Sequence, residues 1–147
     1  MEDSQKNAAL INASLEHVAE KVADLTPQVY ARYFARHPEA RELFGNDDAN
    51  ILKGEMLAKL LMQIMDYAEG KTDPDLIISW AADHLGYGVS LSMVPAMFES
   101  LESVLREVAG DAWTEETTRA WRAQFDGLLA LITDSYKRFD PSFTSPA

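Results

Sequence analysis

Residues 78–89 read ISWAADHLGYGV, a helical run that holds one histidine and ends in glycines. His84 lies late in this run, and Gly86 and Gly88 follow it before the apolar Val89. A helix that ends in this way leaves an imidazole near its last turn, with room for a flat group beneath the ring. A neutral imidazole can bind a metal through one nitrogen while the other donates to a backbone carbonyl of its own turn. The stretch therefore indicates a histidine ligand at a helix end.

Taken alone, a histidine on a helix is more often a structural residue than a metal ligand. Whether His84 is a ligand therefore depends on which other ligands the chain can supply. The chain has three histidines and no cysteine, and no HxxxH or ExxH pair stands near His84. A zinc or di-iron site would lack its ligand set. One protein ligand in apolar surroundings suits a cofactor that brings four nitrogens of its own, which is haem.

The composition restricts the class of protein. A chain of 147 residues suits one domain, which we expect over 1–147 with frayed ends at about 1–8 and 140–147. The net charge of −11 argues against nucleic acid or an anionic membrane as a partner. No apolar run approaches the roughly 20 residues that span a bilayer, and the acidic start MEDSQKNAAL is no secretory signal. A cytoplasmic location follows.

Almost every segment has helical periodicity, and none alternates like a strand. The first stripe comprises Ile11, Leu15, Val18, Val22 and Leu25. Further helices are expected over 27–36 and about 50–68, from the turn at 70–74 through His84, from about 92 to the glycine at 110, and from 114 to about 139, with a short turn at 39–43. The expected N-caps are Thr26, Asp73 and Thr114, and Ser92 or a nearby residue is expected to open its helix. These signals predict six or seven helices in one all-α domain.

Two aromatic residues are candidates for a site. Phe44 closes the short turn, and it is either a core residue or a ring stacked on a porphyrin. Tyr30 lies in a core stripe, where its hydroxyl needs a partner, and an iron-bound oxygen would be one. Other chemistries are poorly supported, because the chain has no GxGxxG or GxxxxGK[ST] loop and no GxSxG motif. The many carboxylates are expected on solvated helix faces.

Three stretches carry a resemblance to a known family. They are YARYFARHPEARELF at 30–44, HLGYGV at 84–89 and TEETTRAWRAQF at 114–125. In this order and at these spacings the chain resembles the globins, and among them the bacterial single-domain haemoglobins and the globin domain of flavohaemoglobins. The resemblance covers about residues 15–136. It implies a three-on-three helical sandwich of about six to eight helices around haem b.

The resemblance also implies roles for individual residues. His84 is the proximal iron ligand, Phe44 packs on the haem and Tyr30 is the distal donor. A one-residue deletion in the loop 45–50 places Lys53 at the distal gate and Leu57 over the iron. The alternative register, Gly54 with Ala58, would turn Lys59 toward the core, where burying an ammonium is costly. The expected haem contacts are Phe44, Lys53, Leu57, Leu61, Trp80, His84, Val89, Met97 and Phe125.

The chain departs from the bacterial pattern beside the proximal histidine. The family has a Tyr–Glu pair there, and the corresponding residues here are Val94 and Tyr136. Without the carboxylate the histidine is less anionic, and its push toward O–O cleavage should be weaker. The resemblance thus favours a globin that binds O₂ reversibly, with NO and CO as competitors, over a peroxidase.

Two other functions use the same residues, so the sequence does not separate them from O₂ storage or transport. One is NO dioxygenation, an enzymatic activity that would need electrons from a separate reductase. The other is sensing of O₂ or NO by a haem module with an unknown partner. A monomer or a homodimer is compatible with each of these functions.

Overall fold

The computed structural model describes residues 2–47 and 49–139. They form α1 (Glu2–Lys21), α2 (Thr26–Arg36), the 3-10 segment η1 (Pro38–Phe44), α3 (Ile51–Ala68), α4 (Pro74–Gly86), α5 (Met93–Ala109), the 3-10 segment η2 (Gly110–Ala112) and α6 (Glu115–Phe139). These ranges hold no strand, which confirms the predicted all-α class. Among them, no helix has the length and apolar character that crossing a bilayer requires. The expected frayed ends stay a prediction: α1 begins at Glu2, and 140–147 lie outside the described residues.

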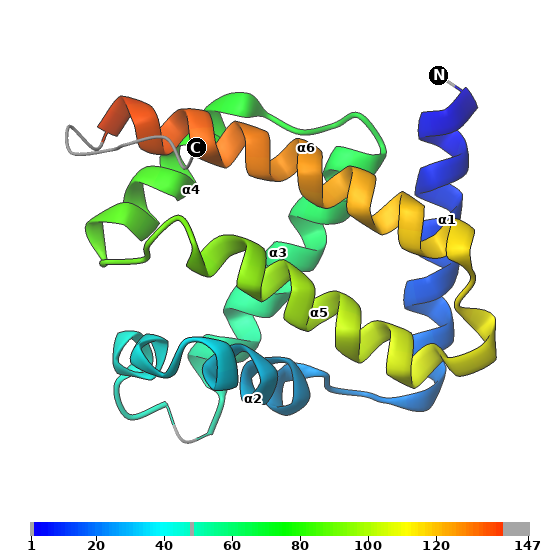
Figure 1. Cartoon of the computed structure of the whole chain (residues 1–147), viewed down its shortest axis with the longest axis horizontal. Coiled ribbons are helices and arrows are strands. Elements are labelled where there is room, and N and C mark those ends of the chain that lie inside the picture. Colours follow the sequence, from blue (N-terminus) through cyan, green and yellow to red (C-terminus); the bar gives the residue numbers. More distant parts are fainter. Residues whose placement is uncertain (1, 48, 140–147) are drawn as a thin grey trace.

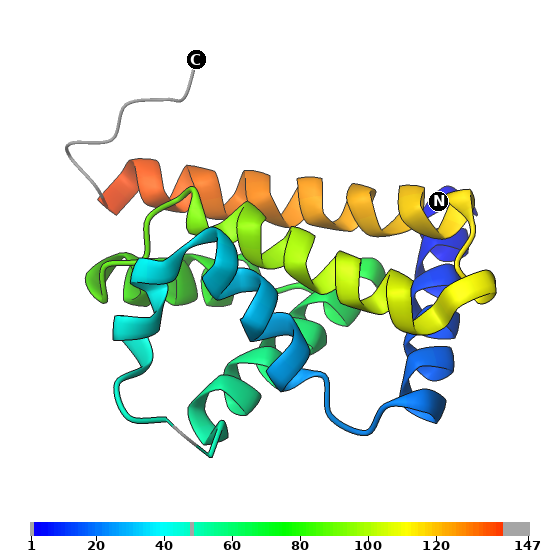
Figure 2. The ribbon, with the colours of Figure 1, turned by 60° about the horizontal axis from the view of Figure 1, so that its bottom comes forward.

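The helices pack in two crossing layers. In Figure 1, α5 and α6 run side by side on the near face, α3 crosses behind them and α1 stands across one end of the molecule. Figure 2 shows α6 above α5, with α2 and α3 on the other side of α5. The apolar faces of α1, α5 and α6 meet in the interior. Fully buried side chains there include Ile11, Val18, Leu101, Leu105 and Trp121.

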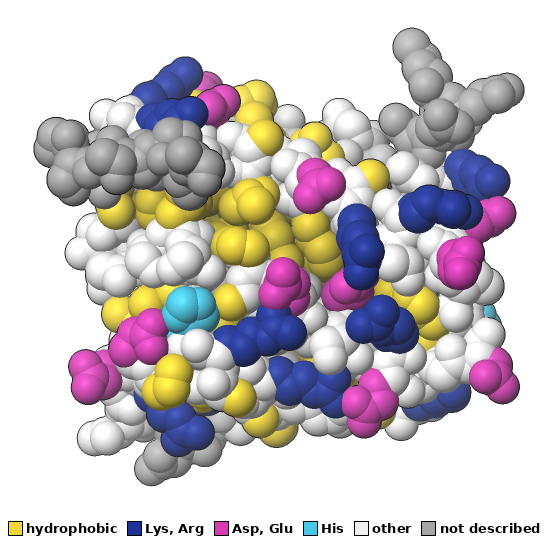
Figure 3. All heavy atoms as spheres, viewed as in Figure 1, with side chains coloured by type: hydrophobic (Ala, Val, Ile, Leu, Met, Phe, Trp, Pro, Cys, Tyr) yellow, Lys and Arg dark blue, Asp and Glu magenta, His cyan; other side chains and the backbone are white. Residues whose placement is uncertain are grey.

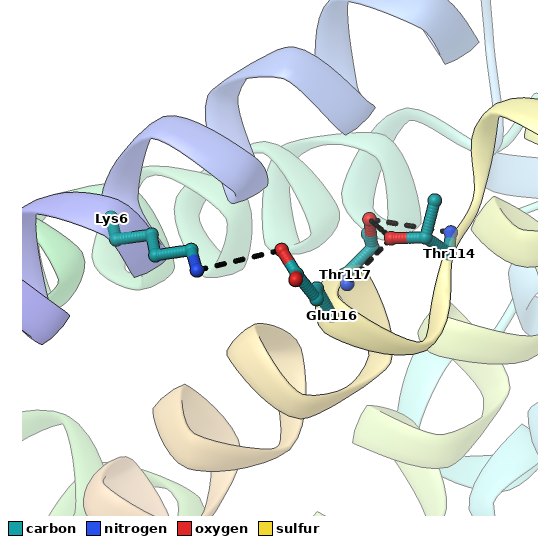
Figure 4. Close-up of polar contacts among 4 residues, drawn as sticks. All are labelled: Lys6, Thr114, Glu116 and Thr117. Atoms are coloured by element: carbon teal, nitrogen blue, oxygen red, sulfur yellow. Dashed lines mark hydrogen bonds and ion pairs between the residues drawn. The ribbon is translucent and has the colours of Figure 1, made fainter.

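The first and last helices are joined directly. The Trp121 indole N–H donates to the Ser14 hydroxyl at 2.9 Å, between residues 107 positions apart in the chain. Lys6 pairs with Glu116 at 3.6 Å where α1 passes the start of α6 (Figure 4). The same view shows the predicted cap of α6, in which the Thr114 hydroxyl accepts the Thr117 N–H at 3.2 Å. The cap satisfies one of the N–H groups that a helix start leaves without a partner.

Two predicted helix ends are wrong. The stripe of the first helix was expected to reach Leu25, but α1 ends at Lys21. Thr26 does not cap α2; its own N–H is bonded by the Asp24 carboxylate at 2.9 Å, and Leu25 is the capping residue without a side-chain bond. The Asp24 turn reverses the chain before the apolar period has ended. A local side-chain bond here overrides the helical pattern.

Two other expectations concern helix starts. Asp73 caps α4 as predicted, because its carboxylate accepts the Asp75 N–H at 3.0 Å. This cap defines the first turn of the helix that carries His84. Ser92 precedes α5 as expected, but its hydroxyl makes no capping bond.

Glycine allows α3 to approach α6 closely, whereas the approach of α3 to α2 does not require one. A Cβ on Gly54 would lie 3.7 Å from the Thr26 hydroxyl of α2, which is an ordinary contact. At Gly127 of α6 a Cβ would lie 2.0 Å from the Tyr67 hydroxyl of α3. The second approach is the closer one, and the sequence did not predict a contact between these two residues.

Ion pairs hold α2 against α5. Arg32 pairs with Glu107 and bonds the Ser103 hydroxyl, and one turn later Arg36 pairs with Glu99. Figure 3 shows side chains of both charges interspersed on this face. These partly exposed contacts connect α5 to α2, the helix that also carries Tyr30.

Candidate functional site

A cavity of about 540 Å³ opens between α2, η1, α3, α4 and α5. Six of the residues expected at a haem site line it: Tyr30, Phe44, Trp80, His84, Val89 and Met97. They come from four segments far apart in the sequence. The other lining residues are Tyr33, Leu43, Leu52, Met56, Lys59, Leu60, Asp83, Tyr87, Met93, Val94 and Phe98.

His84 presents one ring nitrogen for a bond to a ligand. Its Nδ1 donates to the Trp80 carbonyl at 2.7 Å, one turn earlier in α4, so Nε2 carries no proton when the ring is neutral. The Trp80 ring packs against the imidazole with centroids 4.0 Å apart. Burial lowers the pKa of His84 below its usual 6.5, although the Trp80 carbonyl and Asp83 oppose this shift. A neutral imidazole with a fixed orientation is the form that binds a metal.

The turn after His84 is held at both ends. Gly88 has a positive φ of 93°, which lets the Val89 N–H donate back to the His84 carbonyl at 2.9 Å. Gly86, which was also expected to make the turn, is the last helical residue. From α6 the Tyr136 hydroxyl donates to the Val89 carbonyl at 2.8 Å.

No carboxylate bonds the His84 imidazole among the described residues. Val94 lines the cavity, and Tyr136 bonds Val89 in place of the ring. Burial raises the pKa of Tyr136 to about 12, so its hydroxyl is a neutral donor. The only bond of Nδ1 that the structure shows is the one to Trp80.

Tyr30 is a hydrogen-bond donor on the cavity wall. Its residue is 3% exposed, and its ring meets the edge of Phe44 with centroids 5.2 Å apart. Burial, and then the nearby Tyr33 and Asp47, raise the pKa of Tyr30, so the hydroxyl keeps its proton. None of the described residues accepts a hydrogen bond from this hydroxyl, which leaves it available to a molecule in the cavity.

Four expected contacts do not line the cavity. Leu57 is buried in the core, while Leu61 is half-buried and Phe125 stacks on Phe98 with centroids 4.7 Å apart. Lys53 directs its ammonium to Asp47 instead.

The cavity face of α3 is made by Leu52, Met56 and Leu60, which recur at steps of four. The same spacing is present in the sequence one position before Lys53 and Leu57, the residues that were expected to face the haem. Lys59 also lines the cavity, although its side chain remains exposed, so its position carries no cost of a buried ammonium.

The residues present fit haem. Most of the lining side chains are apolar or aromatic, and one neutral imidazole faces the space. No group of three or more metal-binding side chains occurs in the part of the chain that the structure describes. A metal in this cavity would therefore need most of its ligands from a macrocycle.

Comparisons with known proteins agree with this geometry. The Globin family matches residues 27–132. The chain is 26% identical to a flavohemoprotein of Rhizobium meliloti (strain 1021) over 133 residues, or 88% of this chain and 32% of the relative. A flavohemoprotein of Bordetella pertussis is 29% identical over 84% of this chain and 31% of its own length. Leghemoglobin-1 of Vicia faba is 24% identical over 88% of this chain and 96% of its own. The chain thus spans about a third of its flavohemoprotein relatives.

Proposed function

Because the chain belongs to the globin family, as the match over residues 27–132 shows, we propose that it binds haem b and reversibly binds O₂, with NO and CO as competitors. The observation that carries the proposal is the His84 imidazole, which lines an apolar cavity with its Nδ1 bonded to the Trp80 carbonyl. The relatives named flavohemoprotein and leghemoglobin support a haem cofactor.

The chain's own side chains have distinct roles in this proposal. When bound, haem supplies an iron with four ring nitrogens and a position for a gas. His84 holds it through Nε2, and the Nδ1 bond keeps the ring from rotating. Phe44, Val89 and Met97 would supply apolar surface around the bound group and exclude water from it. The Tyr30 hydroxyl, which keeps its proton, would donate a hydrogen bond to a gas held in the cavity and slow its escape.

Titration of the purified protein with haem tests the proposal. We expect one haem per chain, a Soret band and a shift of that band when the reduced protein takes up CO. His84→Ala should lose the histidine-bound spectrum and regain it when imidazole is added. His17→Ala is the matched control, because His17 is exposed on α1 and should leave the spectrum unchanged. A wild-type protein that takes up no haem, or an unchanged His84→Ala spectrum, would contradict the proposal.

A second candidate is NO dioxygenation at the same site, an alternative that the resemblance to the globin domain of flavohaemoglobins leaves open; two relatives carry the name flavohemoprotein. In this reaction NO and O₂ combine to nitrate, and one electron from a separate reductase restores ferrous iron after each turnover. Nearly any globin loaded with O₂ gives one such turnover. Only sustained NO consumption with a reductase and NADH, at a rate that rises with the reductase concentration, would support the enzyme.

A further inference from the structure

The loop before α3 is organised by one residue, Asp47. Its carboxylate oxygens accept the Leu52 N–H at 3.0 Å and the Lys53 N–H at 2.9 Å, which caps the start of α3. Its backbone carbonyl accepts the Asn50 N–H at 3.1 Å. Asn50, at a φ of 59°, makes no capping bond itself. The cap of α3 therefore comes from a residue three positions further upstream.

Asp47 also binds the end of the Lys53 side chain. The ammonium donates to the Asp47 carbonyl at 2.7 Å, and it lies 3.2 Å from the carboxylate. It also lies 5.8 Å from the centre of the Phe44 ring, within the range of a cation–π contact. The side chains of the pair are only 13% and 10% exposed. When an ion pair is this little exposed, removing one partner costs much more free energy than it does in a fully exposed pair.

The position of Lys53 makes this pairing relevant to the cavity. Lys53 follows Leu52, a cavity residue, in the first turn of α3, and its contact Phe44 is itself part of the cavity wall. A lysine stem has four rotatable carbons, so an unpaired amine at this place can turn toward the cavity. An amine there would compete with a gas for the iron and for the Tyr30 hydroxyl.

We propose that Asp47 is a positioning residue that keeps the Lys53 amine out of the cavity and so leaves the space beside Tyr30 open to a gas. The proposal rests on the proposed function, because it assigns a role to this contact at the haem site. The proposal also gives a role to Lys53, which the family resemblance had placed at the distal gate. In the structure this lysine is bound to Asp47 in the loop before α3.

Two measurements on the purified protein test the proposal. The first is the rate at which an amine reagent modifies Lys53, read by mass spectrometry, with the exposed Lys59 as internal reference. The second is the spin state of the ferric haem, read from its absorption spectrum at fixed neutral pH. The variants are Asp47→Asn, Asp47→Glu and the double variant Asp47→Asn with Lys53→Met. Glu55→Gln is the matched control, because it removes a charge from the exposed side of the same helix.

In Asp47→Asn we expect Lys53 to react about fivefold faster or more while Lys59 is unchanged, because one charge-assisted contact is lost. We also expect a low-spin ferric component, which the added Lys53→Met abolishes. Asp47→Glu should restore much of the wild-type behaviour, and Glu55→Gln should match the wild type. An Asp47→Asn protein with wild-type Lys53 reactivity, or a low-spin component that persists after Lys53→Met, would overturn the proposal.

These readouts separate this inference from the proposed function. If neither the wild type nor any variant takes up haem, the proposed function fails. The modification rates still report whether Asp47 holds Lys53. If haem binds normally but Lys53 reacts equally in all variants, only the role of Asp47 is wrong. Circular dichroism of Asp47→Asn shows whether α3 is still folded. Where helix content falls, Asp47→Glu is compared with the wild type instead, and Lys53 reacting in Asp47→Glu as fast as in Asp47→Asn would overturn the proposal.

Discussion

At the scale of single residues, the hydroxyl of Tyr30 should control how long a gas stays bound. It lines the cavity and keeps its proton, because burial raises its pKa. A hydrogen bond to a polarised ligand contributes about 1.5–3 kcal/mol, so Tyr30→Phe should raise the O₂ dissociation rate about tenfold or more. Stopped-flow displacement of O₂ by CO measures this rate.

Tyr33→Phe is the control for that experiment, because Tyr33 lines the same cavity from the next turn of α2. We expect it to change the O₂ dissociation rate by much less than Tyr30→Phe does. Equal effects of the two substitutions would assign the loss to the shape of the wall and would remove Tyr30 from the role of donor.

A second residue-scale prediction concerns acid. Only neutral His84 can bind iron, so haem affinity falls once pH drops below the pKa of this residue. Because burial holds that pKa below 6.5, affinity should be flat from pH 8 to about 6.5 and should fall only at lower pH. Transfer of haem to an excess of an acceptor globin, followed across this range, gives the dissociation rate. A rate that already rises between pH 8 and 7 would mean that His84 is not shielded from water.

The candidate site could be predicted from the sequence only where a residue's own neighbours determine its position. His84 and Phe44 lie in stretches whose helix end and turn can be recognised, and both line the cavity. Lys53 and Leu57 depended instead on the rotation of α3 about its axis. The start of α3 is capped by Asp47, three residues upstream of the left-handed Asn50, and the sequence pattern did not identify this cap.

At the scale of helices, the contact of α3 with α6 depends on Gly127. A methyl group there would meet the Tyr67 hydroxyl at 2.0 Å, so the ring or the helix must shift. Gly127→Ala should destabilise the protein by about 1–3 kcal/mol even though alanine favours helix more than glycine does. Urea unfolding measures this loss.

Gly86→Ala is the matched substitution, since nothing lies within 4 Å of a Cβ at that helical position. It should be neutral or should stabilise by up to about 1 kcal/mol. Tyr67→Leu combined with Gly127→Ala should recover part of the loss. Equal stability of the two single alanine variants would show that α3 and α6 do not approach as closely as described.

Helix ends were predictable where a side-chain cap lies next to the helix. Asp73 and Thr114 both make the expected bonds. The end of α1 could not be predicted in this way. The apolar stripe continues past Lys21, whereas the Asp24 carboxylate already accepts a hydrogen bond from the first residue of α2. Apolar periodicity indicates which face of a helix is buried. It does not indicate where a side chain replaces the next backbone hydrogen bond of the helix and ends it.

At the scale of the whole molecule, the charge should make stability depend on salt. The chain carries a net −11, and the exposed α2–α5 ion pairs contribute little each. Raising the ionic strength from about 0.01 M to about 0.15 M shortens the screening length from about 30 to about 8 Å and weakens the repulsion. The melting temperature should then rise by about 3 °C, or about 1 kcal/mol.

Calorimetry at the two salt concentrations checks this expectation, with Arg36→Gln as the comparison. The variant removes the pair with Glu99 and adds to the net negative charge, so its melting temperature should rise more with salt than that of the wild type. A fall of both melting temperatures would mean that attractive pairs outweigh the net repulsion.

The class and order of the helices follow from the sequence because each helix carries its own apolar stripe and turn. The cavity does not follow in the same way, since its walls come from five elements that are brought together by contacts between residues far apart in the sequence. Only the family resemblance linked these segments before the structure did. The matched residues 27–132 agree with that resemblance.

The bond between Trp121 and Ser14 has a consequence for how a ribosome makes this chain. The two residues stand 107 positions apart, so α1 is complete long before its partner helix exists. At roughly 5–20 residues per second, the wait is about 5–20 s. During that time the apolar face of α1, with Ile11 and Val18, has no α6 to cover it. The nascent chain therefore leaves the part of this apolar face that α6 covers exposed to water until almost the whole protein has emerged.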